Sequence, residues 1–136
     1  MTKKYLDKLT YDVIGAAIEV HKAVGPGLLE SVYHECMKHE LAQRGINFLT
    51  ELIVPVHFKG IMLETDLRCD LFIEKLLVVE LKSVAALAPI HEAQLLTYMK
   101  LLSAPKGLLI NFNCVNIFKE GQKTFVNELF RALPAE

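Results

Sequence analysis

The sequence has few of the features that mark disulfide-rich, metal-thiolate or membrane proteins. Its three cysteines, Cys36, Cys69 and Cys114, lie far apart and form no Cys-x-x-Cys pair. This spacing argues against a disulfide framework and against a cysteine-ligated zinc or iron–sulfur site. No apolar run approaches the roughly 18–20 residues needed to cross a bilayer, and the N-terminal residues lack the apolar stretch of a signal peptide. We therefore expect a cytoplasmic protein with no membrane partner.

Motifs of several common enzyme classes are also missing. There is no G-x-S-x-G nucleophile elbow, no P-loop and no G-x-G-x-x-G dinucleotide fingerprint. His34 and His39 resemble the histidine pair of H-E-x-x-H, but they are five residues apart and do not share a helical face. The sequence therefore contains no zincin motif.

Charge of neither sign is in excess. The 136 residues carry a net charge of −1 at pH 7, with 23% charged and 52% hydrophobic residues. The hydrophobic fraction is enough for a full core, and the length fits one domain over residues 1–136. Proteins that clamp long duplex DNA are usually basic, because phosphate neutralisation drives their affinity. Any contact with nucleic acid is therefore expected to be local, weak or assisted by a metal ion.

Hydrophobic periodicity predicts helices and strands in a mixed order. Two helices come first, with Thr10 as the N-cap of the first of them. The predicted helices cover residues 11–24, 28–44 and 89–102, and the predicted strands cover 52–58, 61–67, 68–73, 76–83 and 106–112. A terminal strand at 115–118 and a tail element at 124–129 complete the pattern. This order predicts an α/β fold with a mixed sheet rather than a doubly wound one.

Three polar residues stand out in the predicted central strands. Glu80 and Lys82 are two residues apart in an apolar strand, so their side chains share a face. Asp70 precedes Glu80 by ten residues, and a hairpin with an odd-numbered loop such as 74–76 places the two carboxylates opposite each other. Two adjacent carboxylates repel unless a cation separates them, and Mg²⁺ or Mn²⁺ prefers such oxygen ligands. The spacing alone is equally compatible with a structural ion-pair network at the sheet edge.

The arrangement of these residues resembles a known family. Asp70 and the Glu80-x-Lys82 element, on a hairpin followed by a helix, are similar to the signature of the PD-(D/E)XK nuclease superfamily. Gln94 and Tyr98 on that helix resemble the Q-x-x-x-Y element of one branch. Gly27-Leu-Leu-Glu-Ser-Val-Tyr33 matches the motif of the GxxExxY protein family within the superfamily. The resemblance covers about residues 8–130, and it departs from the superfamily's name at Cys69, where a proline is expected.

The resemblance implies a fold, an activity and a role for each residue. The fold would be a restriction-endonuclease-like core, with a mixed central β-sheet flanked by helices. The activity would be Mg²⁺- or Mn²⁺-dependent hydrolysis of phosphodiester bonds in DNA by a metal-activated water. Asp70, Glu80 and Glu30 would be metal ligands, and Lys82 would orient or activate the attacking water. Gln94 and Tyr98 would brace Lys82 or contact a substrate phosphate.

Other interpretations remain open from the sequence. The domain could be catalytically silent and serve as a nucleic-acid-binding or protein-interaction module. Tyr33 fits a core position, Glu30 could favour the helix dipole, and Gln94 and Tyr98 could be an ordinary exposed pair. A group of apolar residues late in the chain could form a homo-oligomer interface: Phe118, Phe125, Val126, Leu129 and Phe130.

Overall fold

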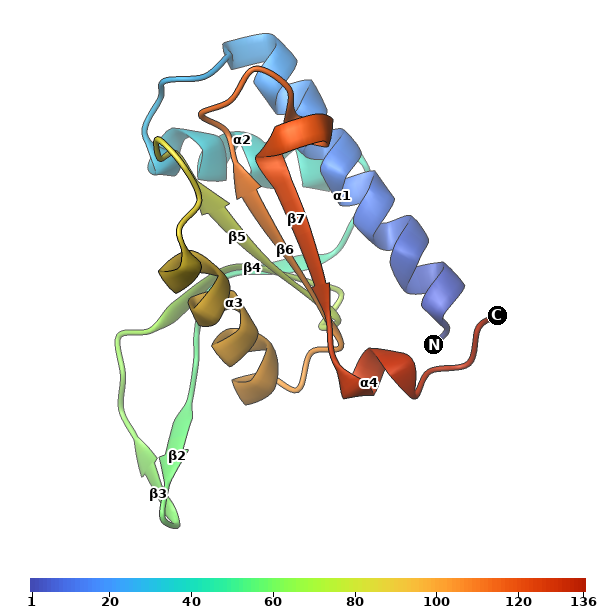
Figure 1. Ribbon diagram of the computed structural model, residues 1–136, viewed down its shortest axis with the longest axis vertical. Coiled ribbons are helices and arrows are strands. Elements are labelled where there is room, and N and C mark those ends of the chain that lie inside the picture. Colours follow the sequence, from blue (N-terminus) through green and yellow to red (C-terminus); the bar gives the residue numbers. More distant parts are fainter.

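A five-stranded sheet with helices on both faces forms the body of the protein (Figure 1). The computed structural model describes residues 1–136. Its helices are α1 (Lys3–Val24), α2 (Glu30–Gln43), α3 (Pro89–Leu101) and α4 (Glu128–Arg131), with a π-helical turn η1 (Ile117–Gly121). Its strands are β1 (Phe48–Ile53), β2 (Val56–Phe58), β3 (Ile61–Leu63), β4 (Arg68–Ile73), β5 (Leu77–Lys82), β6 (Lys106–Asn111) and β7 (Gln122–Val126). None of the helices is long and apolar enough to span a membrane.

The sheet is mixed, as the sequence predicts. Its strand order is β1-β4-β5-β6-β7, which places β5 in the centre. β5 runs antiparallel to β4 and parallel to β6, while β1 and β7 are antiparallel edge strands. Helix α3 connects the parallel pair, as such a crossover requires. A central strand with both faces covered should be apolar on both sides, and Leu77–Leu81 is buried throughout.

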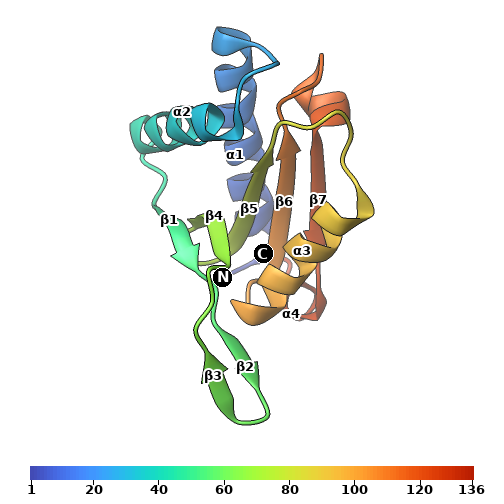
Figure 2. The same ribbon diagram turned by 90° about the vertical axis from the view of Figure 1, so that its left-hand side faces the viewer.

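Two cores lie on opposite faces of the sheet. Val79 and Leu81 of β5 belong to a core with α1 and α2, whereas Val78 belongs to a core with α3. Figure 2 shows the same division, with α1 and α2 on one side and α3 on the other. Since side chains alternate along a strand, Glu80 and Lys82 lie on the α3 side with Val78.

The predicted strands at 52–58 and 61–67 differ most from the structure. β1 begins at Phe48 and pairs with β4, and Pro55 follows its end. Pro55 has no N–H to donate to a ladder, so the chain leaves the sheet there. The short strands β2 and β3 then pair only with each other in a hairpin that stands away from the body (Figure 1).

Two further predictions about elements were wrong, and one was incomplete. Helix α1 starts at Lys3 with Thr2 as its N-cap, whereas Thr10 lies inside the helix and donates its hydroxyl proton to Leu6 O at 2.7 Å. That local bond lets a threonine sit in a helix interior. The predicted strand at 115–118 is replaced by η1, whose first turn is capped by the Asn116 side chain. The tail segment divides into β7 and α4.

Candidate functional site

A tight hairpin brings Asp70 and Glu80 together. β4 and β5 are joined by the three residues 74–76, and Leu71 pairs with Val79. One step further along this register, Asp70 lies opposite Glu80. The odd-numbered loop predicted from the sequence is therefore confirmed, and positive φ angles at Glu74 and Lys75 let the chain reverse.

The two carboxylates take the place of main-chain acceptors between the strands. The N–H of Asp70 donates to Glu80 Oε2 at 2.7 Å, and the N–H of Leu81 donates to Asp70 Oδ2 at 2.8 Å. The second oxygens, Asp70 Oδ1 and Glu80 Oε1, accept no hydrogen bond. Because every fully buried side-chain oxygen in the structure has a partner, these two oxygens are not fully buried. Each carboxylate is therefore fixed by one oxygen, and its other oxygen accepts no hydrogen bond from the protein.

Burial makes the charge of this pair costly. Glu80 is only 3% exposed, and burial raises its pKa to about 8, with the negative charge of Asp70 as the next cause. Burial also raises the pKa of Asp70, against the hydrogen bond from Leu81, which lowers it. A buried carboxylate that retains its proton near neutral pH is typical of functional sites, where a cation completes the charge.

Lys82 places a positive charge near the Asp70 and Glu80 carboxylates without forming an ion pair with either of them. Its positive charge lowers the pKa of both Asp70 and Glu80, so its ammonium lies near them. None of the ion pairs in the structure includes any of these three residues. The structural ion-pair network that the spacing allowed is therefore absent, and the carboxylates lie on a central hairpin rather than at the sheet edge.

Glu30 lies at the margin of this group. It is the exposed first residue of α2, and its charge contributes to the raised pKa of Glu80. No group of three or more His, Cys, Asp and Glu side chains forms a complete ligand set, so Glu30 does not join Asp70 and Glu80 in one cluster. The donor set nevertheless fits Mg²⁺, which proteins commonly hold through one or two carboxylates while it keeps several waters.

Gln94 and Tyr98 face each other one turn apart on α3. Gln94 Nε2 donates to the Tyr98 hydroxyl at 3.3 Å. Tyr98 is only 3% exposed, so the pair is not the exposed one that the sequence left open. Burial raises the pKa of Tyr98, and the charge of Glu80 is the next cause, so its hydroxyl lies within electrostatic reach of the carboxylates.

Comparison with family models identifies the chain. The model of the PD-(D/E)XK nuclease superfamily matches residues 7–125. The protein belongs to the PD-(D/E)XK nuclease superfamily. Its mixed sheet packed between helices is consistent with the restriction-endonuclease-like fold of that superfamily. Neither a curated protein nor a solved structure matches the chain.

In this PD-(D/E)XK protein a histidine outside the predicted set, His34, lies next to Asp70. His34 Nε2 lies 3.2 Å from Asp70 O and 2.8 Å from Thr50 Oγ1, and the histidine's charge lowers the pKa of Asp70. His34 follows Glu30 by four residues and so shares its helical face. The four-residue spacing from Glu30 is the sequence signal for His34, whereas its pairing with His39 is not.

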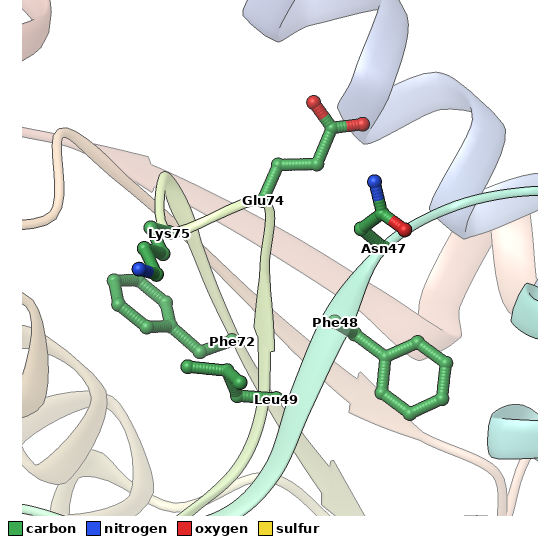
Figure 3. A pocket seen from close by; sticks show the side chains of 6 residues that line it. All are labelled: Asn47, Phe48, Leu49, Phe72, Glu74 and Lys75. Carbon is green, nitrogen blue, oxygen red and sulfur yellow. The ribbon is translucent and has the colours of Figure 1, made fainter.

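A cavity elsewhere in this PD-(D/E)XK protein does not belong to the site. It has a volume of about 350 Å³ and lies at the β4–β5 turn (Figure 3). Six residues line it: Asn47, Phe48, Leu49, Phe72, Glu74 and Lys75. Glu74 accepts a hydrogen bond from the Tyr5 hydroxyl of α1, so its carboxylate already has a structural partner. None of the expected site residues lines this cavity.

Proposed function

We propose that this protein is a Mg²⁺- or Mn²⁺-dependent nuclease that hydrolyses phosphodiester bonds in DNA. The observation that carries the proposal is the Asp70–Glu80 pair, in which each buried carboxylate is fixed by one oxygen and leaves the other free. Membership in the PD-(D/E)XK superfamily, whose nucleases are typically Mg²⁺-dependent, supports the assignment.

Asp70 and Glu80 would hold the metal ion through their free oxygens. Glu30 is the candidate for a third ligand, directly or through a water, because its charge already acts on Glu80. When bound, a divalent cation in such a site polarises a phosphoryl oxygen and favours ionisation of a water. The fixed oxygens would keep both carboxylates aligned before and after binding.

Lys82 is the residue that we assign to the attacking water and the scissile phosphate. Its ammonium makes no ion pair in the protein, so it is free to offset charge that develops on the phosphate. Gln94 and Tyr98 would act from α3, where the Gln94 amide donates to the hydroxyl of the buried Tyr98. We assign them a bracing role or a contact to a substrate phosphate.

Finer assignments follow from the motifs. Gly27, Glu30 and Tyr33 support placement in the GxxExxY family of the superfamily. We propose that residues 1–136 act as one nuclease-like domain, and a cytoplasmic location stays a prediction.

A catalytically silent domain that binds nucleic acid or protein is the second candidate. The net charge of −1 favours it, since nucleases that hold long duplexes usually carry a basic surface. It predicts metal binding without turnover on any nucleic acid.

Cleavage assays separate the two candidates. The protein would be incubated with Mg²⁺ or Mn²⁺ and plasmid, linear duplex, single-stranded and branched DNA, and RNA. We expect metal-dependent cleavage of DNA that falls by roughly 10²–10³-fold in Lys82→Met. Lys100→Met, which removes an exposed lysine of α3, is the matched control and should cleave like the wild type. Metal binding without cleavage of any of these substrates would favour the silent domain.

A further inference from the structure

Two hydroxyl groups hold the loop that leads into Glu30. The Tyr33 hydroxyl donates to Gly25 O at 2.6 Å and accepts from the N–H of Leu28 at 3.2 Å. The Ser83 hydroxyl donates to Leu28 O at 2.6 Å. Both main-chain groups of Leu28, two residues before Glu30, are therefore bonded to side chains, one from α2 itself and one from the residue after β5.

The same contacts lead back to Lys82. The Tyr33 ring is fully buried and stacks on Phe112, with centroids 4.3 Å apart and planes 6° from parallel. The N–H of Phe112 donates to Lys82 O at 2.9 Å, and Ser83 is the next residue in the chain. Ring stacking and hydrogen bonds thus connect the main chain at Lys82 and Ser83 to the loop before Glu30.

The loop itself contributes one further main-chain bond, from the N–H of Gly25 to His21 O at 2.8 Å. Gly25 and Gly27 have φ angles of 72° and 93°, in the region that glycine enters readily. The N-cap residue of α2 is Leu29, which offers no side-chain cap. The start of α2 is therefore set largely by contacts from outside the loop, and the two hydroxyls supply them.

We propose that Tyr33 and Ser83 are positioning residues, whose hydroxyl groups hold Glu30 in place relative to Lys82 and the Asp70–Glu80 pair. The inference rests on the proposed metal site, and it gives the tyrosine of the Gly-x-x-Glu-x-x-Tyr motif a role distinct from core packing. A residue that only packs would need the ring. A residue that positions the loop needs the hydroxyl.

Mn²⁺ titration of matched variants tests this directly. Tyr33→Phe keeps the stacked ring and removes both hydroxyl bonds, Ser83→Ala removes the third, and Ser83→Thr retains a hydroxyl. We expect Mn²⁺ affinity to fall about 10-fold in Tyr33→Phe and Ser83→Ala, the lower end of the range for residues that orient metal ligands. Ser83→Thr should bind close to the wild-type level.

A double-mutant comparison and a control separate positioning from stability. Glu30→Gln should weaken Mn²⁺ binding in the wild type but change it little in the Tyr33→Phe background, because Glu30 is then no longer held. Thr10→Val removes a buried hydroxyl bond to Leu6 O inside α1 that involves no site residue, and it should lower stability without changing Mn²⁺ affinity. Hydrogen exchange at the Leu28 amide should be faster in Tyr33→Phe, independently of metal.

The outcomes distinguish this inference from the proposed function. Folded Tyr33→Phe and Ser83→Ala proteins that bind Mn²⁺ as tightly as the wild type would overturn the inference alone. A wild-type protein that binds no Mn²⁺ at Asp70 and Glu80 would overturn the proposed metal site and the inference with it. If Tyr33→Phe fails to fold, the Ser83→Ala and Ser83→Thr pair decides the question.

Discussion

Asp70 and Glu80 are locked together by the N–H of Asp70, which donates to the Glu80 carboxylate at 2.7 Å across the β4–β5 hairpin. The carboxylate of Asp70 is held in turn by the N–H of Leu81. Two acidic side chains are thus preorganised in a site where burial opposes their ionisation. Because burial opposes the ionisation of this fixed pair, we expect the metal-free protein to respond to pH and to divalent cations.

Stability of the metal-free protein should fall as the pH rises. Glu80 has a raised pKa of about 8 in the folded state, against an ordinary value of 4.5. Between these values the folded state binds a proton that the unfolded state has released, so the free energy of unfolding decreases with pH and levels off above about 8. The raised pKa of Asp70 acts in the same direction at lower pH. Urea denaturation in EDTA should show a loss of a few kcal/mol between about pH 5 and pH 8.5.

Glu80→Gln provides the control for that dependence. The amide retains an oxygen that can accept from Asp70 N–H and carries no charge, so its stability curve should be flatter across the same range. Glu19→Gln, at an exposed position of α1, should leave the slope unchanged. An identical slope in the wild type and Glu80→Gln would mean that Glu80 is not the titrating group.

Mn²⁺ affinity should increase with pH up to about 8. The metal ion must displace the proton that burial retains on Glu80, and affinity then rises by up to about tenfold per pH unit for one released proton. Calorimetric titrations at neutral pH in buffers with different ionisation enthalpies measure the number of protons released on binding. We expect this number to be close to one per Mn²⁺ ion. An affinity that is constant between about pH 6 and pH 8 would contradict ion binding at Glu80.

Loss of His34 should raise the pKa of Asp70. The histidine charge lowers that pKa, and its ring lies within 3.2 Å of the Asp70 carbonyl oxygen. Carboxyl ¹³C NMR titration of His34→Gln should therefore show Asp70 titrating at higher pH than in the wild type. The pKa of Asp70 should be unaltered in His39→Gln, which removes another histidine of α2.

The apolar residues near the C-terminus predict self-association. Phe118 and Leu129 are 58% and 48% exposed, and β7 is an edge strand with a free side. Edge strands of this kind can pair with a second copy. Light scattering should give a dimer mass that returns to the monomer in Phe118→Lys or Leu129→Lys. A monomeric mass at high protein concentration would rule this interface out.

The central part of the fold and site could be predicted because its signals are local. The apolar run before Glu80, the ten-residue separation from Asp70 and the proline at the start of α3 each depend only on neighbouring residues. They predict the hairpin, the shared face and the following helix. Pro55 gives a local signal for the end of β1 that the predicted strand at 52–58 passed over, whereas the π-helical turn η1 depends on its contacts with α1 and β6.

Contacts between distant segments could not be read from the sequence in the same way. His34 reaches Asp70 from 36 residues away, and Ser83 reaches Leu28 from 55 residues away. Neither residue belongs to the Asp70, Glu80 and Lys82 pattern. Tyr33 was predicted as a core residue, and its burial confirms this, but the partners of its hydroxyl depend on the path of the Gly25–Leu28 loop.

A crystal structure of the protein soaked with Mn²⁺ above about pH 8.5, where Glu80 is ionised, would show whether Asp70 and Glu80 hold one ion. Anomalous scattering would locate the ion without reference to activity. We expect one strong peak that contacts Asp70 Oδ1 and Glu80 Oε1, with Glu30 within reach of the ion or of its waters. A site left empty at saturating Mn²⁺, or an ion bound only elsewhere on the protein, would contradict it.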